Sequence, residues 1–280
     1  MQFEPKQSVT IASWNVSGIR ALFKKAETIG LKDFISQTDF DILCVQETKY
    51  SSESQIKLPD YVKAQWPHAT WSINPGISQK KGLSGTAILS KVEPISVISQ
   101  PDFDTEGRIT CVEFEKFIVV CVYTPNSQAM NSDRFVYRTE IWDTLFRNFV
   151  AELNKKKPTI VAGDLNTVER ECDYHNFKKF RNMAPGLYDK ERENFALLKN
   201  IGPFVDSYTL INPDKISYSY WSNFCKQRVN PGDGSGKAPN GWVLDNILCC
   251  ESLRDSIIDS GRYKNQFGSD HVPIYVHLSL

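Results

Sequence analysis

Short apolar runs rich in β-branched residues recur along the chain and constrain its fold more than any other feature. Runs of this kind are typical of strands buried in a sheet. They are Val9–Trp14, Asp41–Gln46, Ser84–Ser90, Phe117–Tyr123, Thr159–Asp164, Trp242–Leu248 and Val272–Leu280. Between some of them the apolar residues follow the helical period, clearly over Asp133–Leu153 and more weakly over Lys190–Asn200. Strands interleaved with helices predict an α/β fold, with two sheets packed together between helices.

The chain reads as one domain. Its 280 residues, of which 41% are hydrophobic, are enough for one large core. We find no internal repeat, no low-complexity tract and no long linker. The Gly- and Pro-rich segment Lys226–Gly241 is a loop, and its late position favours an insertion over a domain boundary. We therefore expect a single domain over residues 1–280, with a core from about residue 8 onwards.

Composition excludes several classes of function. No apolar stretch is long enough to span a membrane, and MQFEPKQSVTIASWN lacks the layout of a secretory signal, so we expect a soluble intracellular protein without a membrane partner. The seven cysteines are odd in number and form no CxxC pair, which favours buried free thiols over disulfides or zinc. With 33 basic and 33 acidic residues the net charge is zero, so a nucleic acid would have to bind a local basic surface.

Polar side chains stand at the ends of the apolar runs. A single case has an ordinary explanation, because turns favour Asn and Asp. Repeated at several strand ends in a layered sheet, such side chains are expected to meet at one rim. The residues concerned are Asn15, Glu47, Tyr123, Asn126, Asp164, Asn166, Asp245, Asp270 and His271.

This set of side chains favours metal-assisted phosphoryl chemistry. Carboxylate and amide oxygens suit Mg²⁺ or Mn²⁺, which retain waters that a phosphate can displace. The chain has no serine elbow, no GxxxxGK loop and no cysteine beside a histidine. Hydrolysis of a phosphodiester needs an oriented water, neutralisation of charge and help for the leaving oxygen. An acid, a metal-binding glutamate and a histidine polarised by an aspartate would meet these needs.

The motifs around these residues resemble those of the exonuclease III-type apurinic/apyrimidinic (AP) endonucleases, in the endonuclease/exonuclease/phosphatase superfamily. Isolated GDLN or SDH motifs also occur in phosphatases, sphingomyelinases and deadenylases of the superfamily, but the whole set follows the order of the DNA-repair branch. The motifs are SWNVSGIRA (13–21), QETK (46–49), EGR (106–108), YTPN (123–126), GDLN (163–166), GWVLD (241–245) and SDH (269–271). The resemblance implies a four-layered α/β sandwich, two mixed β-sheets packed face to face and flanked by helices.

The resemblance also implies an activity. It is Mg²⁺-dependent cleavage of the DNA backbone 5′ of abasic sites, with 3′–5′ exonuclease or 3′-phosphodiesterase activity as further possibilities. The implied partner is double-stranded DNA with abasic sites or 3′ ends, bound by a monomer that is nuclear in a eukaryote and cytoplasmic in a bacterium. Two alternatives stay open. One is a catalytically weakened DNA-binding member, and the other is a superfamily phosphodiesterase that acts on RNA or small phosphoesters.

Roles for individual residues follow from their matching positions. Glu47 is expected to be the principal ligand of Mg²⁺, or of Mn²⁺ in its place, with Asp270 and Asn15 assisting. Asp164 would orient or deprotonate the water, and His271, fixed by Asp245, would stabilise charge on the phosphate. Phosphate and leaving-group contacts are expected from Tyr123, Asn126 and Asn166.

Substrate binding is expected from a basic groove and an aromatic wall. The basic residues are Arg20, Arg108, Lys178, Lys179 and Arg181, with Lys24 and Lys25 nearby. The wall would hold an extrahelical abasic sugar and consists of Tyr220, Trp242 and Leu244. His175 is at best a surface contact to DNA.

The chain departs from the family pattern at a few places. Ser17 stands where the family usually has Asp or Asn, so we expect a weaker contact with the metal. The segment Glu169–Pro185 does not align with the family's asparagine-bearing phosphate loop, where Asn176 or Asn182 could substitute. Tyr220 replaces a common phenylalanine, and the Lys226–Gly241 loop is longer than usual, which could shift the balance between incision and 3′ trimming.

Overall fold

The computed structural model describes residues 8–74, 76, 80–222 and 224–280. The first seven residues, which begin the stretch MQFEPKQSVTIASWN, and Asn223 lie outside the described residues.

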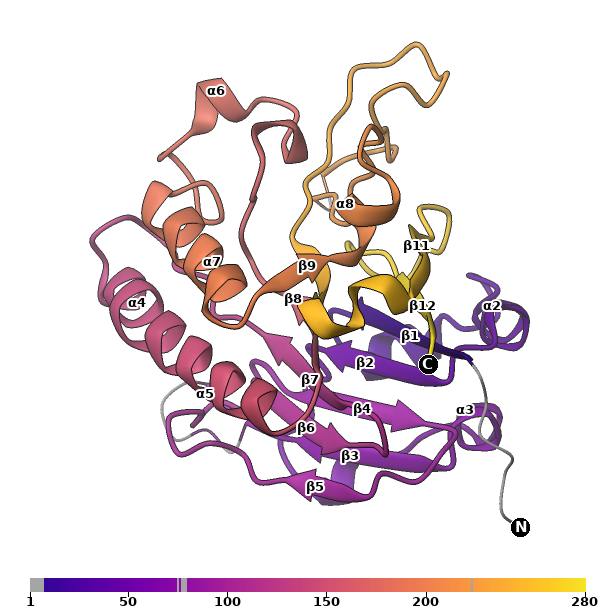
Figure 1. The fold of residues 1–280 in the computed structure, drawn as a ribbon. Coiled ribbons are helices and arrows are strands. Elements are labelled where there is room, and N and C mark those ends of the chain that lie inside the picture. The colour runs from indigo at the N-terminus through magenta and orange to yellow at the C-terminus, as the bar shows by residue number, and fades with distance from the viewer. Residues whose placement is uncertain (1–7, 75, 77–79, 223) are drawn as a thin grey trace.

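Two mixed six-stranded sheets form the centre of the protein (Figure 1). The first sheet has the order β11-β12-β1-β2-β4-β3, and the second has the order β5-β6-β7-β8-β10-β9. The strands of the first sheet are β1 (Ser8–Asn15), β2 (Ile42–Gln46), β3 (His68–Ser72), β4 (Thr86–Ser90), β11 (Ile257–Arg262) and β12 (Ile274–Ser279). Those of the second are β5 (Ser96–Ile98), β6 (Ile109–Glu113), β7 (Ile118–Tyr123), β8 (Thr159–Asp164), β9 (Phe204–Asp206) and β10 (Asp245–Cys250). Within each sheet one neighbouring pair is parallel, β1 with β2 and β7 with β8.

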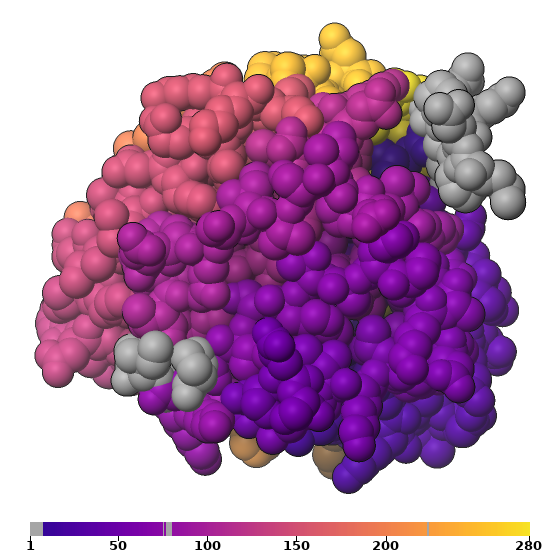
Figure 2. Space-filling model, turned by 90° about the horizontal axis from the view of Figure 1, so that it is seen from below, coloured from indigo at the N-terminus to yellow at the C-terminus, as the bar shows by residue number. Residues whose placement is uncertain are grey.

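Helices cover the outer faces of both sheets, which confirms the expected four-layered sandwich (Figure 1). Beside the first sheet lie α1 (Ile19–Lys24), α2 (Leu31–Thr38) and α3 (Asp60–Gln65). Beside the second lie α4 (Asp133–Val136), α5 (Asp143–Lys156) and α7 (Asp189–Ile201). The short helices α6 (Phe177–Phe180) and α8 (Ser207–Ile211) belong to the connections, as do the 3₁₀ turns Glu53–Gln55, Glu171–Asp173 and Glu251–Ser256. Seen from below, where β3 and β5 are the edge strands, the surface is formed largely by the first half of the chain (Figure 2).

The predicted helix 133–153 is one continuous helical segment with a π-helical stretch, Tyr137–Trp142, between α4 and α5. A π-helical stretch redirects side chains and is often found near functional sites. Here it carries Arg138, which is buried and donates to the carbonyl oxygens of Pro125 at 2.7 Å and Leu165 at 3.1 Å. One guanidinium therefore ties together the loops that follow β7 and β8.

The main core lies between the two sheets. Ile11 of β1 and Cys44 of β2 lie in this layer with Cys121 of β7 and Ile160 of β8, and all four are fully buried. Strands covered on both faces need apolar side chains in both directions, which explains why their sequences are continuous apolar runs. All seven cysteines are free thiols, and five of them are buried.

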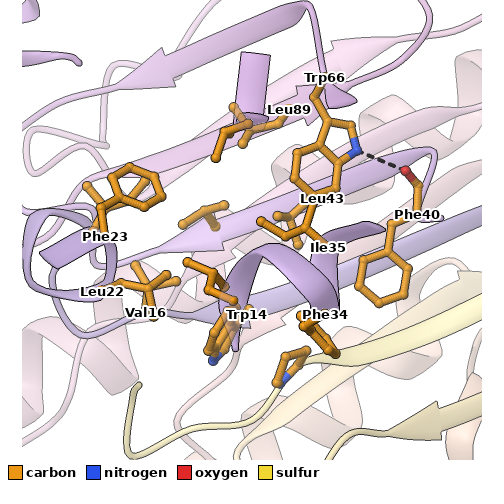
Figure 3. A pocket seen from close by; sticks show the side chains of 15 residues that line it. Trp14, Val16, Leu22, Phe23, Phe34, Ile35, Phe40, Leu43, Trp66 and Leu89 are labelled. Atoms are coloured by element: carbon orange, nitrogen blue, oxygen red, sulfur yellow. Dashed lines mark hydrogen bonds between the residues drawn. The ribbon is translucent and has the colours of Figure 1, made fainter. Parts of the chain in front are cut away.

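A second core lies outside the first sheet, under α1, α2 and α3. This core contains a small apolar cavity of about 30 Å³, and Trp14 and Trp66 are among the side chains that line it (Figure 3). The Trp66 Nε1 donates to the Phe40 carbonyl oxygen at 2.9 Å. A cavity of this size lined only by apolar groups gives a water no partners, so it is expected to stay dry. This core fixes the outer side of β1, and hence the position of Asn15 at its end.

One predicted strand begins later in the structure than the sequence indicated, next to the candidate site. The run Trp242–Leu248 was expected to be a strand throughout, but β10 begins only at Asp245. The preceding residues form isolated bridges, with Trp242 paired to Tyr174 and to Tyr220. Because β10 begins late, Trp242 pairs with Tyr174 and Tyr220 outside the sheet, where its side chain forms part of the aromatic wall.

The sheet topology brings the polar strand ends together. The carboxyl ends of the parallel neighbours β1 and β2 lie at one edge, and so do those of β7 and β8. The strands β10 and β12 run antiparallel to β8 and β1, so their amino ends reach the same edge. None of the helices in the described part of the chain is long and apolar enough to cross a bilayer.

Candidate active site

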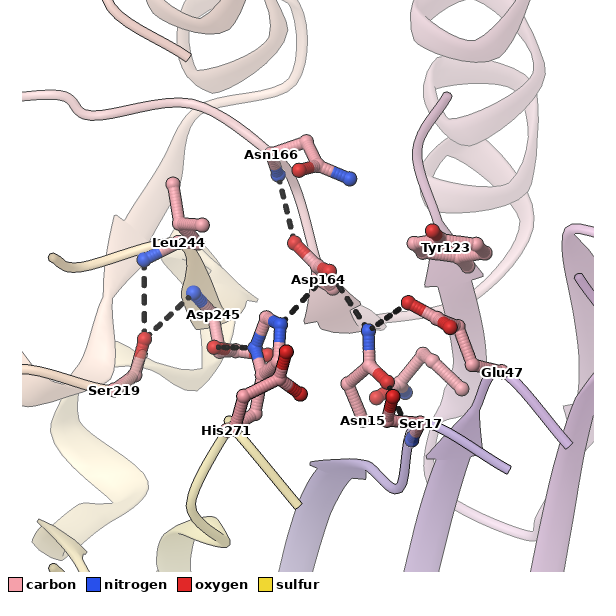
Figure 4. A network of polar contacts seen from close by, with 12 residues as sticks. Asn15, Ser17, Glu47, Tyr123, Asp164, Asn166, Ser219, Leu244, Asp245 and His271 are labelled. Carbon is pink, nitrogen blue, oxygen red and sulfur yellow. Dashed lines mark hydrogen bonds and ion pairs between the residues drawn. The ribbon is translucent and has the colours of Figure 1, made fainter. Parts of the chain in front are cut away.

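Two buried aspartates and a histidine form the centre of the site. Asp164, the last residue of β8, is directly opposite Asp245, the first residue of β10. The Nδ1 atom of His271 lies 2.7 Å from the Asp245 Oδ2, and its Nε2 lies 3.7 Å from the Asp164 Oδ2. The Ser219 hydroxyl accepts the backbone N–H groups of Leu244 and Asp245, each at 3.0 Å, which fixes the start of β10. The imidazole is therefore held between two carboxylates from neighbouring strands (Figure 4).

The charged groups in this centre shift one another's pKa values. Burial alone would lower the pKa of His271, but Asp245 and Asp164 together raise it to about 10. Burial, with Asp245 adding to it, raises the pKa of Asp164 to about 7, against the opposing effect of His271. The imidazole is thus a cation at neutral pH, while Asp164 can take up or release a proton there.

Asn15 connects the two sheets at the site. Its side-chain Nδ2 donates to Glu47 Oε1 at 3.0 Å and to Asp164 Oδ2 at 2.9 Å, as Figure 4 shows. Its Oδ1 accepts the backbone N–H of Ser17 at 3.0 Å. Asn15 is fully buried, so its amide holds both carboxylates in fixed positions relative to each other.

Glu47 has a cationic partner that sequence reasoning did not single out. The Lys49 Nζ lies 2.9 Å from the Glu47 Oε2. Although burial opposes ionisation, this ammonium holds the pKa of Glu47 below its usual value. Glu47, Lys49 and Ser17 all have positive φ, at 54°, 56° and 48°. Such conformations cost free energy in non-glycine residues, and they cluster at functional sites. The only sequence indication for Lys49 was its place in the QETK motif.

The predicted phosphate-contacting residues lie around this centre with different partners. The Asn166 backbone N–H donates to the Asp164 Oδ1 at 3.0 Å, and its side chain donates to the Thr124 carbonyl oxygen at 2.8 Å. Burial raises the pKa of Tyr123 well above its usual range, and Glu47 adds to this, so the phenol keeps its proton. Asn126 is exposed, and its side-chain oxygen accepts the backbone N–H of Gln128 at 2.9 Å.

The predicted aromatic wall lies against the histidine. The Tyr220 ring centroid is 4.8 Å from that of His271 and 6.3 Å from that of Trp242. Trp242 packs in turn on Tyr174 at 4.1 Å, and Leu244 is buried in the same cluster. The wall is therefore continuous with the imidazole.

The predicted basic residues divide into exposed and buried groups. Lys178 and Lys179 are exposed on α6, and Lys24, Lys25 and Arg20 are exposed around α1. Arg181 is exposed and forms a bidentate pair with Asp189, at 2.8 and 3.1 Å.

Arg108 differs from these residues because only 3% of it is exposed. It pairs with Glu106 at 2.5 Å, and its guanidinium stacks on the Tyr123 ring at 4.7 Å. Its immediate contact is thus the phenol, not solvent.

The segment Glu169–Pro185 places its polar residues apart from the carboxylates. The Asn182 side chain is engaged with Asp189, and Asn176 is exposed just before α6. His175 lies against Tyr174 at 4.5 Å, with its Nδ1 3.5 Å from the Gly241 carbonyl oxygen.

The side chains at the centre fit a metal ion. Ligand atoms of Asp164, Asp245 and His271 lie within 4.8 Å of one another, and because a protonated imidazole cannot ligate a metal, the carboxylates are the groups that could hold the ion. The buried Oδ1 of Asp245 has no hydrogen-bond partner within the described residues. A buried carboxylate oxygen without a donor is costly unless a cation or a water satisfies it. The expected ligands Glu47 and Asp270 belong to the same surroundings, because both contribute to the electrostatics of His271 or its neighbours.

Comparison with known proteins gives relatives over the whole chain. The model described as Endonuclease/Exonuclease/phosphatase family matches residues 12–271. An exodeoxyribonuclease of Bacillus subtilis is 37% identical over 275 residues, which covers 96% of this chain and 99% of that protein. The DNA repair nuclease APEX1 of Danio rerio is 36% identical over 279 residues, which covers 98% of this chain and 83% of that protein.

Solved structures with the same fold include an AP endonuclease from Leishmania major. Its TM-score is 0.80 at 25% identity, covering 99% of this chain and 90% of that chain. A 3′ phosphatase from Neisseria, solved with a product DNA hairpin, has a TM-score of 0.79 at 21% identity, covering 97% and 100%. At that identity the second similarity shows the fold alone.

Proposed function

This chain belongs to the Endonuclease/Exonuclease/phosphatase family, and from that premise we propose that it is a DNA-repair phosphodiesterase that cleaves the backbone 5′ of abasic sites. The observation that carries the proposal is the pair of contacts made by Asn15, which holds Glu47 of one sheet and Asp164 of the other. These contacts set a metal-binding carboxylate and a candidate base at a fixed separation. The exodeoxyribonuclease and DNA repair relatives over the whole chain support the same activity.

Asp164 is the proposed base. Its pKa, raised to about 7 mainly by burial, suits proton transfer near neutral pH. The amide of Asn15 and the backbone N–H of Asn166 each donate to one of its oxygens, which orients the carboxylate towards a water. The proton of that water passes to Asp164 while the water oxygen attacks the phosphorus, the bond from phosphorus to the 3′ oxygen breaks, and that oxygen leaves as a hydroxyl after taking up a proton.

His271 and Tyr123 are the proposed contacts of the reacting phosphate. The imidazolium of His271, fixed by Asp245, is a preorganised cation for the charge that develops on the phosphate oxygens. Tyr123 stays protonated, so its hydroxyl can donate to a phosphate oxygen or to the leaving oxygen. Asn126 and Asn166 would complete the phosphate site.

We propose Mg²⁺ as the metal, with Mn²⁺ as a substitute, held by Glu47 and assisted by Asp270 and Asn15. Oxygen-only side chains are the ligands these cations prefer. The bound cation would neutralise charge on the attacked phosphate. Lys49 pairs with Glu47 at 2.9 Å and would give up this contact when the metal binds.

Substrate recognition is proposed to use the wall and the basic surface. Tyr220, Trp242 and Leu244 would hold the abasic sugar outside the helix, directly beside His271. Lys178, Lys179, Arg20 and Arg181 would contact the DNA backbone, whereas Arg108 would act from beneath Tyr123. All of these residues come from one chain, so we propose that the enzyme works as a monomer, which sedimentation of the protein with DNA would test.

The test uses three substrates with and without Mg²⁺. They are a duplex with one abasic analogue, a 3′-recessed duplex and a short RNA. We expect incision 5′ of the abasic site, loss of cleavage in EDTA and recovery with Mg²⁺ or Mn²⁺. Cleavage that persists in EDTA would contradict the metal assignment. Preferred cleavage of RNA would favour another phosphodiesterase of the family, and DNA binding without cleavage would favour a weakened member.

Variants test the individual roles in the same assay. Asp164→Asn and His271→Ala should each lower turnover by about 100-fold or more, in line with the loss of a preorganised electrostatic contact. Circular dichroism checks that each variant is folded. A folded variant with near-normal turnover would remove that residue from its proposed role.

A further inference from the structure

Arg228, at the start of the Lys226–Gly241 segment, reaches the loop that leads to Asp270. Its Nη1 donates to the carbonyl oxygens of Lys264 at 3.1 Å and Gln266 at 2.7 Å, and its Nη2 donates to that of Ser269 at 2.5 Å. One guanidinium thus binds three carbonyls of the loop 263–270. A planar fork of donors can hold several acceptors at once, which the single ammonium of a lysine cannot do in the same geometry.

The side chain of Arg228 is also fixed by its surroundings. Its guanidinium lies 5.5 Å from the Trp221 ring centroid and 4.8 Å from that of Phe267. Burial lowers the pKa of Arg228, against the opposing attraction of Asp270. Arg228 is partly buried, and a cation that loses water contacts needs other partners, so these carbonyl contacts explain its position.

The loop 263–270, which Arg228 clamps through these three carbonyls, continues directly into the site. The Ser269 hydroxyl donates to the Asn15 carbonyl oxygen at 2.7 Å, and the Trp221 backbone N–H donates to the Asp270 carbonyl oxygen at 2.9 Å. The backbone of Ser269 and Asp270 is therefore held from β1 on one side and from the segment containing Trp221 and Arg228 on the other. His271 follows at the next position.

A second contact joins the same two segments. The Lys264 Nζ lies 3.0 Å from the Asp233 Oδ2. Asp233 is itself fixed, because its carboxylate accepts the backbone N–H groups of Asn230 at 3.2 Å and Ser235 at 3.0 Å. The Lys226–Gly241 segment, which the sequence marked only as a long loop, is thereby attached to the loop that carries Asp270.

We propose that Arg228 is a positioning residue that holds Asp270 for the metal, so that the Lys226–Gly241 segment sets the metal affinity of the site. This inference rests on the proposed function for the identity of the metal site. Residues that orient ligands from behind typically change metal affinity by about 10- to 100-fold when they are lost.

Two variants separate positioning from charge. Arg228→Met removes both the charge and the three hydrogen bonds but keeps a long side chain between Trp221 and Phe267. Arg228→Lys keeps the positive charge but lacks the planar guanidinium that forms the three hydrogen bonds. If positioning dominates, both variants should bind metal more weakly, by about 10-fold. If only the charge near Asp270 matters, Arg228→Met should bind metal more tightly and Arg228→Lys should be unchanged, which would overturn the proposal.

The readout is Mn²⁺ binding to the DNA-free protein, followed by electron paramagnetic resonance of the unbound ion. Lys226→Met is the matched control, since Lys226 is exposed in the same segment, and it should bind Mn²⁺ as the wild type does. Urea unfolding in EDTA checks the fold, and Arg228→Lys remains informative if Arg228→Met does not fold. Unchanged affinity in a folded Arg228→Lys protein would contradict the clamp.

Activity gives an independent comparison. In abasic-site cleavage the two variants should need about 10-fold more Mg²⁺ for half-maximal rate, with turnover at saturating Mg²⁺ near the wild-type value. A wild-type protein that binds Mn²⁺ but does not cut abasic DNA would contradict the proposed function. In that case the Mn²⁺ affinities of the wild type and the Arg228 variants would still test whether Arg228 positions Asp270.

Discussion

Asp245 and Asp164 are directly opposite each other in an antiparallel ladder, although they are 81 positions apart in the sequence. One carboxylate begins its strand and the other ends its strand, so the ladder register alone sets their separation. Two facing carboxylates repel each other when both are charged, and the imidazolium of His271 between them offsets this repulsion. The charge state of the centre is therefore a property of all three groups.

Gly163→Ala is predicted to disturb this register. The Cβ of an alanine at position 163 would lie 1.9 Å from the Val122 carbonyl oxygen, so β7 and β8 could not keep their pairing beside Tyr123 and Asp164. We expect a loss of about 3 kcal/mol in the free energy of unfolding, measured with urea, and a large loss of turnover. Gly202→Ala is the control, because its nearest neighbour is the end of the flexible Asn154 side chain at 3.0 Å. Equal stability of the two variants would show that the strands can move apart at little cost.

His271 is predicted to stay protonated well above neutral pH in the metal-free protein. Its pKa rises from 6.5 to about 10 in the folded state, chiefly through Asp245 once the opposing effect of burial is overcome. NMR titration of the imidazole in EDTA measures this value. Asp245→Asn should bring it down, whereas Asp259→Asn, which alters a carboxylate bonded to Tyr275, should not. Titration of wild-type His271 near 6.5 would contradict the assignment.

The same shift gives a pH dependence of stability. Because the folded pKa lies above the unfolded one, the stabilisation from charged His271 is complete below about pH 6.5 and is lost as the pH rises towards 10. Urea unfolding in EDTA across this range should therefore show a smaller decline for Asp245→Asn than for the wild type.

The sequence predicted the buried strands well because their composition is dictated by burial on both faces. Val9–Trp14 and Thr159–Asp164 are examples, and their polar ends do meet at one edge. Contacts made across the fold left no comparable pattern. Nothing in the order of residues indicates that Arg228 binds the carbonyl of Ser269 or that Arg108 stacks on Tyr123. The sequence analysis placed Arg108 in the expected basic groove, but in the structure Arg108 is buried and pairs with Glu106.

Ser17→Asp is predicted to lower the Mg²⁺ requirement of abasic-site cleavage. A carboxylate reaches further than a hydroxyl and adds negative charge near Glu47 and Asn15, so the cation should bind more tightly. The change is compatible with the backbone, because Ser17 has a φ of 48° and aspartate tolerates this region better than most residues. Ser17→Asn introduces a side chain as long as that of aspartate but without the charge. Comparing the two variants therefore shows whether length or charge lowers the Mg²⁺ requirement. An unchanged or higher Mg²⁺ requirement for Ser17→Asp would mean that Ser17 has no contact with the metal site.

Replacing both Lys178 and Lys179 with Glu, which reverses their charge, is predicted to weaken DNA binding. Both lysines are exposed on α6, and contacts with phosphates release counterions, so affinity should fall and its dependence on salt should become less steep. Fluorescence anisotropy with a labelled abasic duplex at several salt concentrations measures both effects. Lys155 and Lys156, at the end of α5, provide the control pair, and unchanged affinity for the α6 variant would assign its lysines to ordinary surface.

The pairing of β1 with β12, from Ser8 with Ser279 to Ser13 with Ile274, joins the two ends of the described chain in one sheet. Nearly the whole described sequence separates β1 from β12, so β1 is synthesised long before this partner. Until then β1 has an unpaired edge, which in other proteins invites association with foreign strands. His271 directly precedes β12, so the pairing of β1 with β12 also brings His271 to the strand end that carries Asn15.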